Sequence, residues 1–212
     1  MRLRGKSQEA ASYRAAAANA GLLAARAGAW WATGNDGFIV DAGHDMGDVI
    51  SLAAKAKAIE TESHDTPKRK KLRQRLRIGA AGLFLSGGLF GLYTGADQLA
   101  NDKSEDAGAL ALATAVATAA ATFEIARRTH AHIDDGDDHH ADHSASHDLK
   151  LHVWGDAASS AVYATSLGLQ AITGASYAGS AGVAASGLLT TGLALKTFQE
   201  IRKDSDSTPI CF

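Results

Sequence analysis

A short pattern, a histidine followed four residues later by an aspartate, recurs far apart in the chain, at His44/Asp48 and at His152/Asp156. Residues four apart lie on the same face of an α-helix, so each pair would present an imidazole and a carboxylate together. Two imidazoles and two carboxylates make a tetrahedral ligand set that suits zinc, and the carboxylates balance the charge of a divalent ion. Magnesium and calcium prefer oxygen ligands alone, whereas other divalent transition metals remain compatible. The pattern therefore predicts a metal site formed by two helices.

Two further aspartates accompany the first pair. Asp41 lies one turn before His44 and is expected to orient its ring from outside the ligand set. Asp45 either lines an entry path or faces water. A lone histidine or aspartate could instead cap a helix or bind a backbone carbonyl. Several such residues on two helical stripes favour a functional site, because ionisable groups at membrane depth usually mark an ion or proton path.

A tract rich in histidine and aspartate precedes the second pair, over residues 129–147. Its histidines are His130, His132, His139, His140, His143 and His147. Tracts of this composition are typically metal-binding, and we expect this one to gather metal ions near the entrance of the site. The alternative is a solvated acidic linker in which the histidines have no role.

The elements that position these residues are predicted to be helices. The chain has 212 residues and only 2 prolines, and patterns that indicate strands are scarce. We predict an all-α chain with a single domain over residues 1–212. Its six helices are expected at about 15–33, 37–55, 76–96, 107–127, 148–170 and 176–201. Gly87, Gly91 and Gly95 recur every four residues in the third helix, which permits the close approach of another helix.

Long stretches of the sequence carry no Asp, Glu, Lys, Arg or His, namely residues 78–96, 107–123 and 157–195. A helix on the surface of a soluble bundle needs charged residues on its wet face, so these stretches are either buried all round or placed in lipid. The mean hydropathy of -0.09 is low because alanine, glycine, serine and threonine dilute the apolar stretches. We predict a six-helix transmembrane bundle, with a soluble alanine-rich bundle as the alternative.

Basic residues recur on alternate connections. They occupy the segment before the first helix, residues 68–77, the end of the fourth helix and the end of the sixth, whereas residues 97–106 are acidic. This is the positive-inside pattern, and it predicts cytoplasmic N- and C-termini. The run at 68–77 has no aromatic platform or docking motif beside it, so contact with lipid headgroups is favoured and no nucleic-acid partner is expected.

The motifs resemble those of the cation diffusion facilitators. Asp41-Ala42-Gly43-His44 with Asp48 is similar to the family's motif on helix 2, and His152 to Asp156 is similar to its motif on helix 5. The stretch from Asn19 through Arg26 to Gly34 resembles its first helix. The likeness covers most of residues 15–200 and is specific at helices 1, 2 and 5.

The resemblance implies a transporter that exports zinc, or a related divalent metal, in exchange for protons across the plasma membrane. It implies metal ligands at His44, Asp48, His152 and Asp156, and it implies no cofactor. The expected partners are the metal ion, protons and the lipid bilayer, with a homodimer as an open alternative. The chain departs from the family after Ile201, where only residues 202–212 follow and no cytoplasmic domain is expected.

Two other functional classes stay open from the sequence. The chain could be a membrane metal sensor or buffer that binds without transporting, or a soluble metal-binding bundle. An enzyme is not expected, because no nucleophile, cofactor loop or open metal site is apparent. The single cysteine, Cys211, excludes a disulfide within the chain and carries no assigned role.

Overall fold

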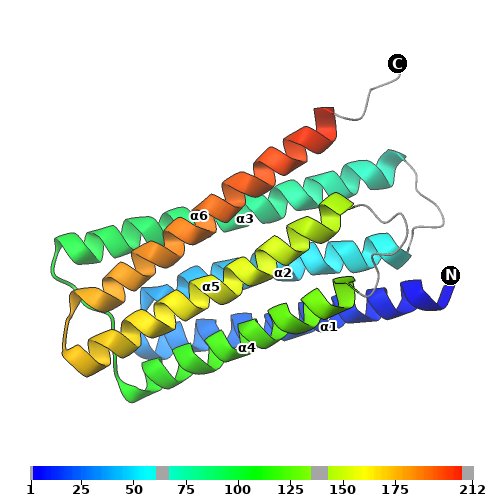
Figure 1. Ribbon diagram of the computed structural model, residues 1–212. Helices are drawn as coiled ribbons and strands as arrows, with labels where there is room; N and C mark the ends of the chain where they lie inside the picture. The colour runs from blue at the N-terminus through cyan, green and yellow to red at the C-terminus, as the bar shows by residue number, and fades with distance from the viewer. Residues whose placement is uncertain (1, 61–66, 135–142, 207–212) are drawn as a thin grey trace.

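The computed structural model describes residues 2–60, 67–134 and 143–206, and side chains are described at 12–53, 74–131 and 153–203. The described chain is entirely helical and contains no strand, which confirms the predicted fold class (Figure 1). The six helices are α1 (Arg2–Thr33), α2 (Asp36–Glu60), α3 (Pro67–Ala100), α4 (Ala109–Asp134), α5 (His143–Thr173) and α6 (Tyr177–Asp206).

The helices are longer than the sequence predicted, and the extensions lie at the basic end of the bundle. The basic run at 68–77 belongs to α3 rather than to a connection. Lysine, arginine, glutamine and leucine are good helix formers, so a charged sequence can continue a helix beyond the apolar stretch. The predicted loop at 129–147 is likewise shortened, because α4 continues to Asp134 and α5 begins at His143.

The α1–α2 and α5–α6 turns, at the end of the bundle opposite the basic residues, are built in the same way. Gly34 and Gly174 adopt φ values of 73° and 70°, in the left-handed region that favours glycine. The amide of Gly34 donates to the carbonyl of Trp30 at 2.7 Å, and that of Gly174 donates to Gln170 at 2.8 Å. Each glycine therefore ends its helix with a left-handed cap and lets the next helix return alongside.

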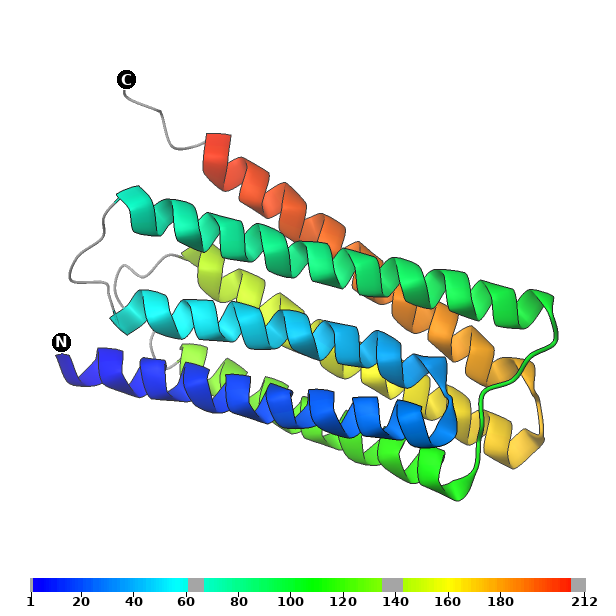
Figure 2. The ribbon, with the colours of Figure 1, turned by 180° about the vertical axis from the view of Figure 1, so that it is seen from behind.

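Neighbouring helices form a closed ring in the order α1, α2, α3, α6, α5, α4 and back to α1. Within this ring α2 also contacts α5 and α6, so the helices that carry the two motifs meet near the centre. The start of α1 and the end of α6 lie at one end of the bundle (Figure 2). The α1–α2, α3–α4 and α5–α6 turns lie at the other end.

The α3–α6 contact depends on glycines. A Cβ atom on Gly88 would lie 2.6 Å from the amide nitrogen of Thr191, and one on Gly95 would lie 2.5 Å from that of Ala184. On the other side, a Cβ on Gly187 would lie 2.4 Å from the amide nitrogen of Leu92. Of the predicted glycine series, Gly95 faces α6 and Gly87 faces α2, whereas Gly91 lies against both, beside Val40 and Gly187. The backbones of α3 and α6 are therefore in direct contact.

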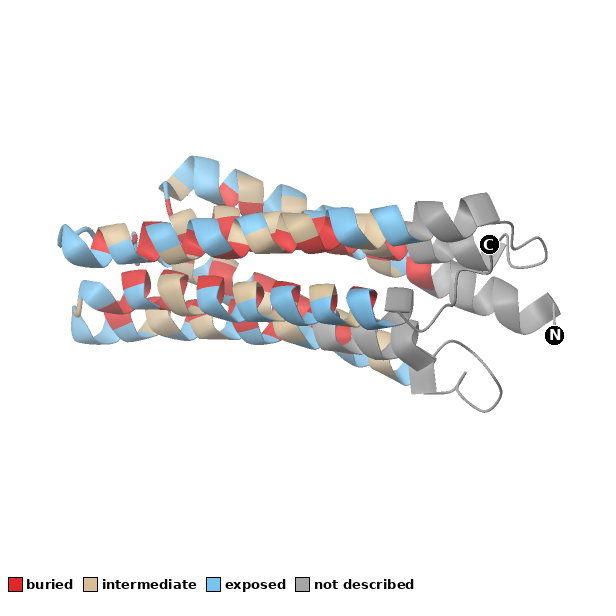
Figure 3. Cartoon of the chain, turned by 90° about the horizontal axis from the view of Figure 1, so that it is seen from above, coloured by how far each residue is buried: buried red, intermediate tan, exposed pale blue. Residues whose placement is uncertain are grey.

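The described helices combine buried and exposed positions along their length (Figure 3). The interior mixes polar side chains with clusters of apolar ones, and many large apolar side chains are exposed on the outside. The exposed set includes Trp31, Leu89, Phe90, Tyr93, Leu110, Val116, Phe123, Leu169, Ile172, Tyr177 and Leu188. An apolar exterior on this scale indicates a surface that is covered by another apolar phase.

Three of the described helices are long and apolar enough to cross a membrane, which is fewer than the six that the sequence predicted. They cover Gln74–Ala100, Ala109–Ala131 and Tyr177–Lys203, on α3, α4 and α6. Among the described helices, the other three carry the buried ionisable residues, including Arg26 on α1 and four such residues in one part of α2. Such residues lower the mean hydropathy of a helix even when they face inward. The chain is thus compatible with a membrane protein.

Candidate metal and ion-pair centre

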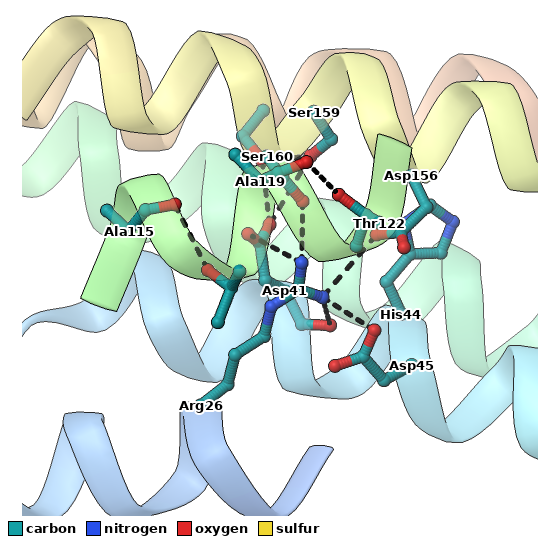
Figure 4. A network of polar contacts seen from close by, with 12 residues as sticks. Arg26, Asp41, His44, Asp45, Ala115, Ala119, Thr122, Asp156, Ser159 and Ser160 are labelled. Atoms are coloured by element: carbon teal, nitrogen blue, oxygen red, sulfur yellow. Dashed lines mark hydrogen bonds and ion pairs between the residues drawn. The ribbon is translucent and has the colours of Figure 1, made fainter. Parts of the chain in front are cut away.

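Ionisable side chains from α1, α2 and α5 gather in the middle of the bundle (Figure 4). Asp41, His44, Asp45 and Asp48 come from α2, and Asp156 comes from α5. Arg26, from α1, lies among them. All six are at most 3 % exposed. The helical spacing on α2 brings its four residues to one side, as the sequence predicted.

Arg26 is at the centre of the cluster and is fully buried. Its Nη1 donates to Oδ1 of Asp45 at 2.6 Å, and its Nη2 donates to Oγ of Ser160 at 2.6 Å. Longer contacts reach Oδ1 of Asp156 at 3.5 Å and Oδ2 of Asp41 at 3.7 Å. A guanidinium with several donors in one plane can hold carboxylates from different helices at once. Arg26 therefore joins α1 to both motif-bearing helices.

The two His-x-x-x-Asp motifs meet through one contact. Nδ1 of His44 lies 3.3 Å from Oδ1 of Asp156, across the α2–α5 boundary. The imidazole ring packs edge-on against Phe84 of α3, with centroids 4.6 Å apart. Nε2 of His44 is buried and has no hydrogen-bond partner. This nitrogen is thus an unused donor or acceptor inside the bundle.

Asp41 does not act on His44 in the way the sequence suggested. Its Oδ1 accepts long hydrogen bonds, at 3.4 Å each, from the hydroxyls of Ser159 on α5 and Ser186 on α6. These two hydroxyls also contact each other. With Arg26 on its other side, Asp41 is a junction between α1, α5 and α6 rather than a support for the imidazole.

Asp45 and Asp48 differ in their surroundings. Asp45 is buried against Arg26, so it neither faces water nor stands at an open entrance, although its Oδ2 has no hydrogen-bond partner. Oδ2 of Asp48 is also buried without a hydrogen-bond partner. An uncompensated buried carboxylate oxygen is costly, and such oxygens are typical where a cation or a proton is expected.

Only part of the predicted ligand set falls among the described side chains. His44, Asp48 and Asp156 lie in one cluster, whereas the side chain of His152 lies outside the described residues. Within the described part, no group of three or more His, Cys, Asp or Glu side chains has a metal-holding arrangement. Arg26 occupies the space between the carboxylates. Sequence reasoning placed Arg26 on the first helix without a role, although a lone arginine on a helix rich in alanine implies a buried acidic partner.

The histidine tract is described only at its edge. His130 is half-buried on α4, and its ring lies edge-on to Trp154 with centroids 6.2 Å apart. The other five predicted metal-gathering residues, His132, His139, His140, His143 and His147, have side chains outside the described residues.

A second polar cluster closes the end of the bundle opposite the basic residues, and sequence reasoning missed it. Glu105, in the α3–α4 connection, is 3 % exposed. It accepts hydrogen bonds from Gln98 of α3 at 2.6 Å, from the hydroxyl of Tyr163 at 3.0 Å, and from the first amide of α2, at Asp36, at 3.3 Å. Its own backbone carbonyl accepts from Gln170 at 2.6 Å. One acidic residue of the connection thus joins α2, α3 and α5.

The environment of Glu105 also changes its acidity. Burial raises the pKa of the Glu105 carboxyl above its usual range, and the hydrogen bonds from Gln98 and Tyr163 offset part of that effect. Beside it, the side-chain amide of Asn35 donates to the carbonyl of Asp106 and accepts from its amide, at 2.7 Å each. The connection is therefore fixed to the turn between α1 and α2.

No family model matches the chain, and no curated protein matches it. The fold and the site define an all-helical chain with three candidate membrane spans and a buried cluster of charged residues at its centre.

Proposed function

We propose that the chain is a divalent metal transporter of the cation diffusion facilitator type, which exports zinc from the cytoplasm in exchange for protons. All six helices cross the plasma membrane in this proposal, with both termini in the cytoplasm. The observation that carries it is the contact between His44 and Asp156, which joins the two motifs in a buried site between α2 and α5. His152, from the same motif as Asp156, would complete the ligand set with Asp48.

The chemistry of these ligands supports exchange for protons. Metal ions bind deprotonated imidazole and carboxylate, so protonation of the same groups releases the ion. Imidazole titrates near neutral pH in water, which makes His44 and His152 the expected proton carriers. Asp48 and Asp156 would balance the charge of the ion. The other divalent transition metals use similar ligands, so the assay should compare zinc with cobalt, cadmium and manganese.

The test is metal flux into proteoliposomes that contain the purified full-length chain. Asp156→Asn should reduce zinc flux by at least about 100-fold, because the variant cannot provide a charged ligand. Asp97→Asn is the matched control, since Asp97 is a partly exposed residue near the end of α3, away from the cluster, that pairs with Lys103. Equal flux in wild type and Asp156→Asn would rule out the proposed site.

Two further measurements separate the alternatives. A binding-only sensor would bind zinc in detergent but give no flux in the same liposomes. Proton coupling predicts that an imposed pH gradient, acidic on the side to which zinc is released, accelerates flux. Flux that does not respond to the gradient would exclude exchange while leaving metal transport in place.

The capture role of the histidine tract is tested in the same liposomes. Replacing its six histidines by serine should raise the zinc concentration needed for half-maximal flux, with little change in maximal flux, because local enrichment matters only at low metal. An unchanged half-saturation concentration would favour the solvated-linker alternative.

A further inference from the structure

Arg26 places a permanent positive charge at the position where a metal ion would meet Asp156. Arginine is not deprotonated in proteins, so this charge is present in every state of the site. The guanidinium has no exposed surface, and Nε of the same side chain has no hydrogen-bond partner. Arg26 is therefore a cation built into the carboxylate cluster.

The contacts of Arg26 fall into a short and a long group. The short ones, at 2.6 Å each, are to Asp45 and to the hydroxyl of Ser160. The longer ones are to Oδ1 of Asp156 at 3.5 Å, to Oδ2 of Asp41 at 3.7 Å and to the backbone carbonyl of Asp41 at 3.3 Å. A charged hydrogen bond is strongest below about 2.9 Å, so Asp45 and Ser160 anchor the guanidinium while it reaches only weakly to the other two.

The charges of the cluster leave room for a further cation. Its four carboxylates, when ionised, exceed the one guanidinium by three negative charges. A divalent ion would reduce that excess to one. Oδ2 of Asp45, Oδ2 of Asp48 and Nε2 of His44 are buried in this cluster without a hydrogen-bond partner.

We propose that Arg26 is a tethered counter-cation that competes with the metal ion for Asp156 and thereby sets the affinity of the site. Asp45 anchors the guanidinium. In this proposal Asp45 therefore positions Arg26 and does not line an entry path. The inference rests on the proposed function, since it concerns the same site. Without a metal ion Arg26 holds the carboxylates together, and with one it withdraws from Asp156 while keeping Asp45 and Ser160.

The proposal predicts that removal of the guanidinium tightens metal binding. In Arg26→Gln the ion no longer competes with a neighbouring positive charge, so its dissociation constant should fall at least about tenfold. Release should then limit transport, so the zinc concentration for half-maximal flux and the maximal flux should both fall. A residue that only supports the fold would weaken binding when removed.

The experiment measures zinc binding to the detergent-purified full-length chain by competition with a chromophoric zinc indicator at one pH. The proteins compared are wild type, Arg26→Gln, Arg26→Lys and Asp156→Asn. Arg26→Lys retains the charge and should bind zinc within about threefold of wild type, because the competing cation is still present. Asp156→Asn should weaken binding.

The possible results distinguish the proposed role of Arg26 from the proposed function of the protein. If wild type does not bind zinc, the proposed function fails. If wild type binds and Arg26→Gln binds equally or more weakly, the role of Arg26 is overturned while the function stands.

Should Arg26→Gln fail to fold, the double variant Arg26→Gln/Asp45→Asn decides, because it removes the cation with its anchor and keeps the net charge of the cluster. It too should bind more tightly than wild type, and equal or weaker binding would overturn the proposal.

Discussion

Asp45 and Asp48 are three residues apart on α2, yet the structure gives them different roles. Asp45 accepts the shortest charged contact of Arg26, at 2.6 Å. Asp48 has a buried Oδ2 without a hydrogen-bond partner, and no ion pair of Asp48 is found among the described residues. Removing one partner of a buried ion pair leaves the other charge unpaired in a medium of low dielectric constant, which destabilises the fold. Removing a buried charge that has no partner instead removes the free-energy cost of burying it.

The two isosteric substitutions should therefore have opposite effects on the metal-free protein. Asp45→Asn should lower its thermal stability, by about 3 kcal/mol in free energy of unfolding, because Arg26 loses its anchor. Asp48→Asn should leave the metal-free stability unchanged or raise it. The measurement is thermal unfolding in detergent with a chelator present.

Addition of zinc provides the second half of that comparison. A ligand that binds only the folded state raises its melting temperature, so wild type should be stabilised by zinc. Asp48→Asn should lose this stabilisation because it lacks a ligand, while Asp45→Asn should retain part of it. Equal loss of metal-free stability in both variants would contradict the distinction between them.

Residue types and spacing predicted much of the candidate site but not its partners. The period of the helix brings Asp41, His44, Asp45 and Asp48 to one side of α2, and this can be derived without a structure. Which helix supplies the opposing groups depends on long-range packing. For that reason the contacts of Asp41 with Ser159 and Ser186, and the position of Arg26, could not be derived from local pattern.

At the scale of the helices, the contact between α3 and α6 should be sensitive to a single methyl group. A Cβ on Gly187 would lie 2.4 Å from the amide nitrogen of Leu92, and backbone atoms cannot move aside as a side chain can. Gly192, on the same helix, has nothing within 4 Å of such a Cβ. The two positions form a matched pair for one substitution.

Gly187→Ala should destabilise the protein by roughly 2 kcal/mol, because the helices must separate or the backbone must bend. Gly192→Ala should be neutral or stabilising by about 0.5–1 kcal/mol, because alanine is the better helix former in open space. Thermal unfolding of both variants in detergent checks the pair. A Gly187→Ala protein as stable as Gly192→Ala would mean that α3 and α6 are not in direct contact.

Glu105, in the α3–α4 connection, is expected to make the stability of the folded chain depend on pH. Burial raises the pKa of Glu105, so in the window between the unfolded value and the raised value the folded chain binds more protons than the unfolded chain. Stability contributed by Glu105 is therefore present below this window and is lost as pH rises through it.

Glu105→Gln removes this titration and keeps groups able to bond Gln98 and Tyr163. Relative to that variant, wild type should lose thermal stability as pH rises from about 4.3 upward through the raised pKa. Melting curves of both proteins over a pH series give the difference directly. A difference independent of pH would show that Glu105 titrates as an ordinary exposed carboxyl.

The positions of the helices were predicted well and their ends were not. Uncharged stretches locate the middle of α3, α4 and α6, because burial or lipid selects against charge there. The basic end of α3 extends to Pro67, where no packing requirement marks the sequence. The role of Glu105 was also missed, since residues 97–106 read only as an acidic connection.

In the described part of the molecule, a charged centre and clusters of apolar side chains share the interior, and many large apolar side chains lie outside. The helices α3, α4 and α6 carry the stretches apolar enough to span a membrane, and they expose residues such as Phe90, Val116 and Leu188. The helices α1, α2 and α5 contribute the charged centre, which the rest of the bundle encloses. In lipid, charged groups must face the interior of a bundle and pair there. This division is what a membrane carrier requires, and it explains why composition marks only half of the helices.

The distribution of charge between the two ends of the bundle predicts how it is oriented across the membrane. Basic residues collect at the end that holds both termini, and the end with the α3–α4 connection is acidic. Basic segments remain in the cytoplasm during insertion. Lys103 lies in that connection and Arg128 near the end of α4, and their side chains are 62 % and 72 % exposed.

Each position can therefore report the side on which it lies. With Cys211 replaced by serine, a cysteine at position 103 in the Lys103→Cys variant should react with a membrane-impermeant maleimide in intact cells. The Arg128→Cys variant should react only after the membrane is permeabilised, because the proposed orientation places its end of the bundle in the cytoplasm. Reaction of Arg128→Cys alone in intact cells would reverse the orientation and with it the direction of export. Recovery of both variants in the soluble fraction would show that the apolar exterior is covered by something other than lipid.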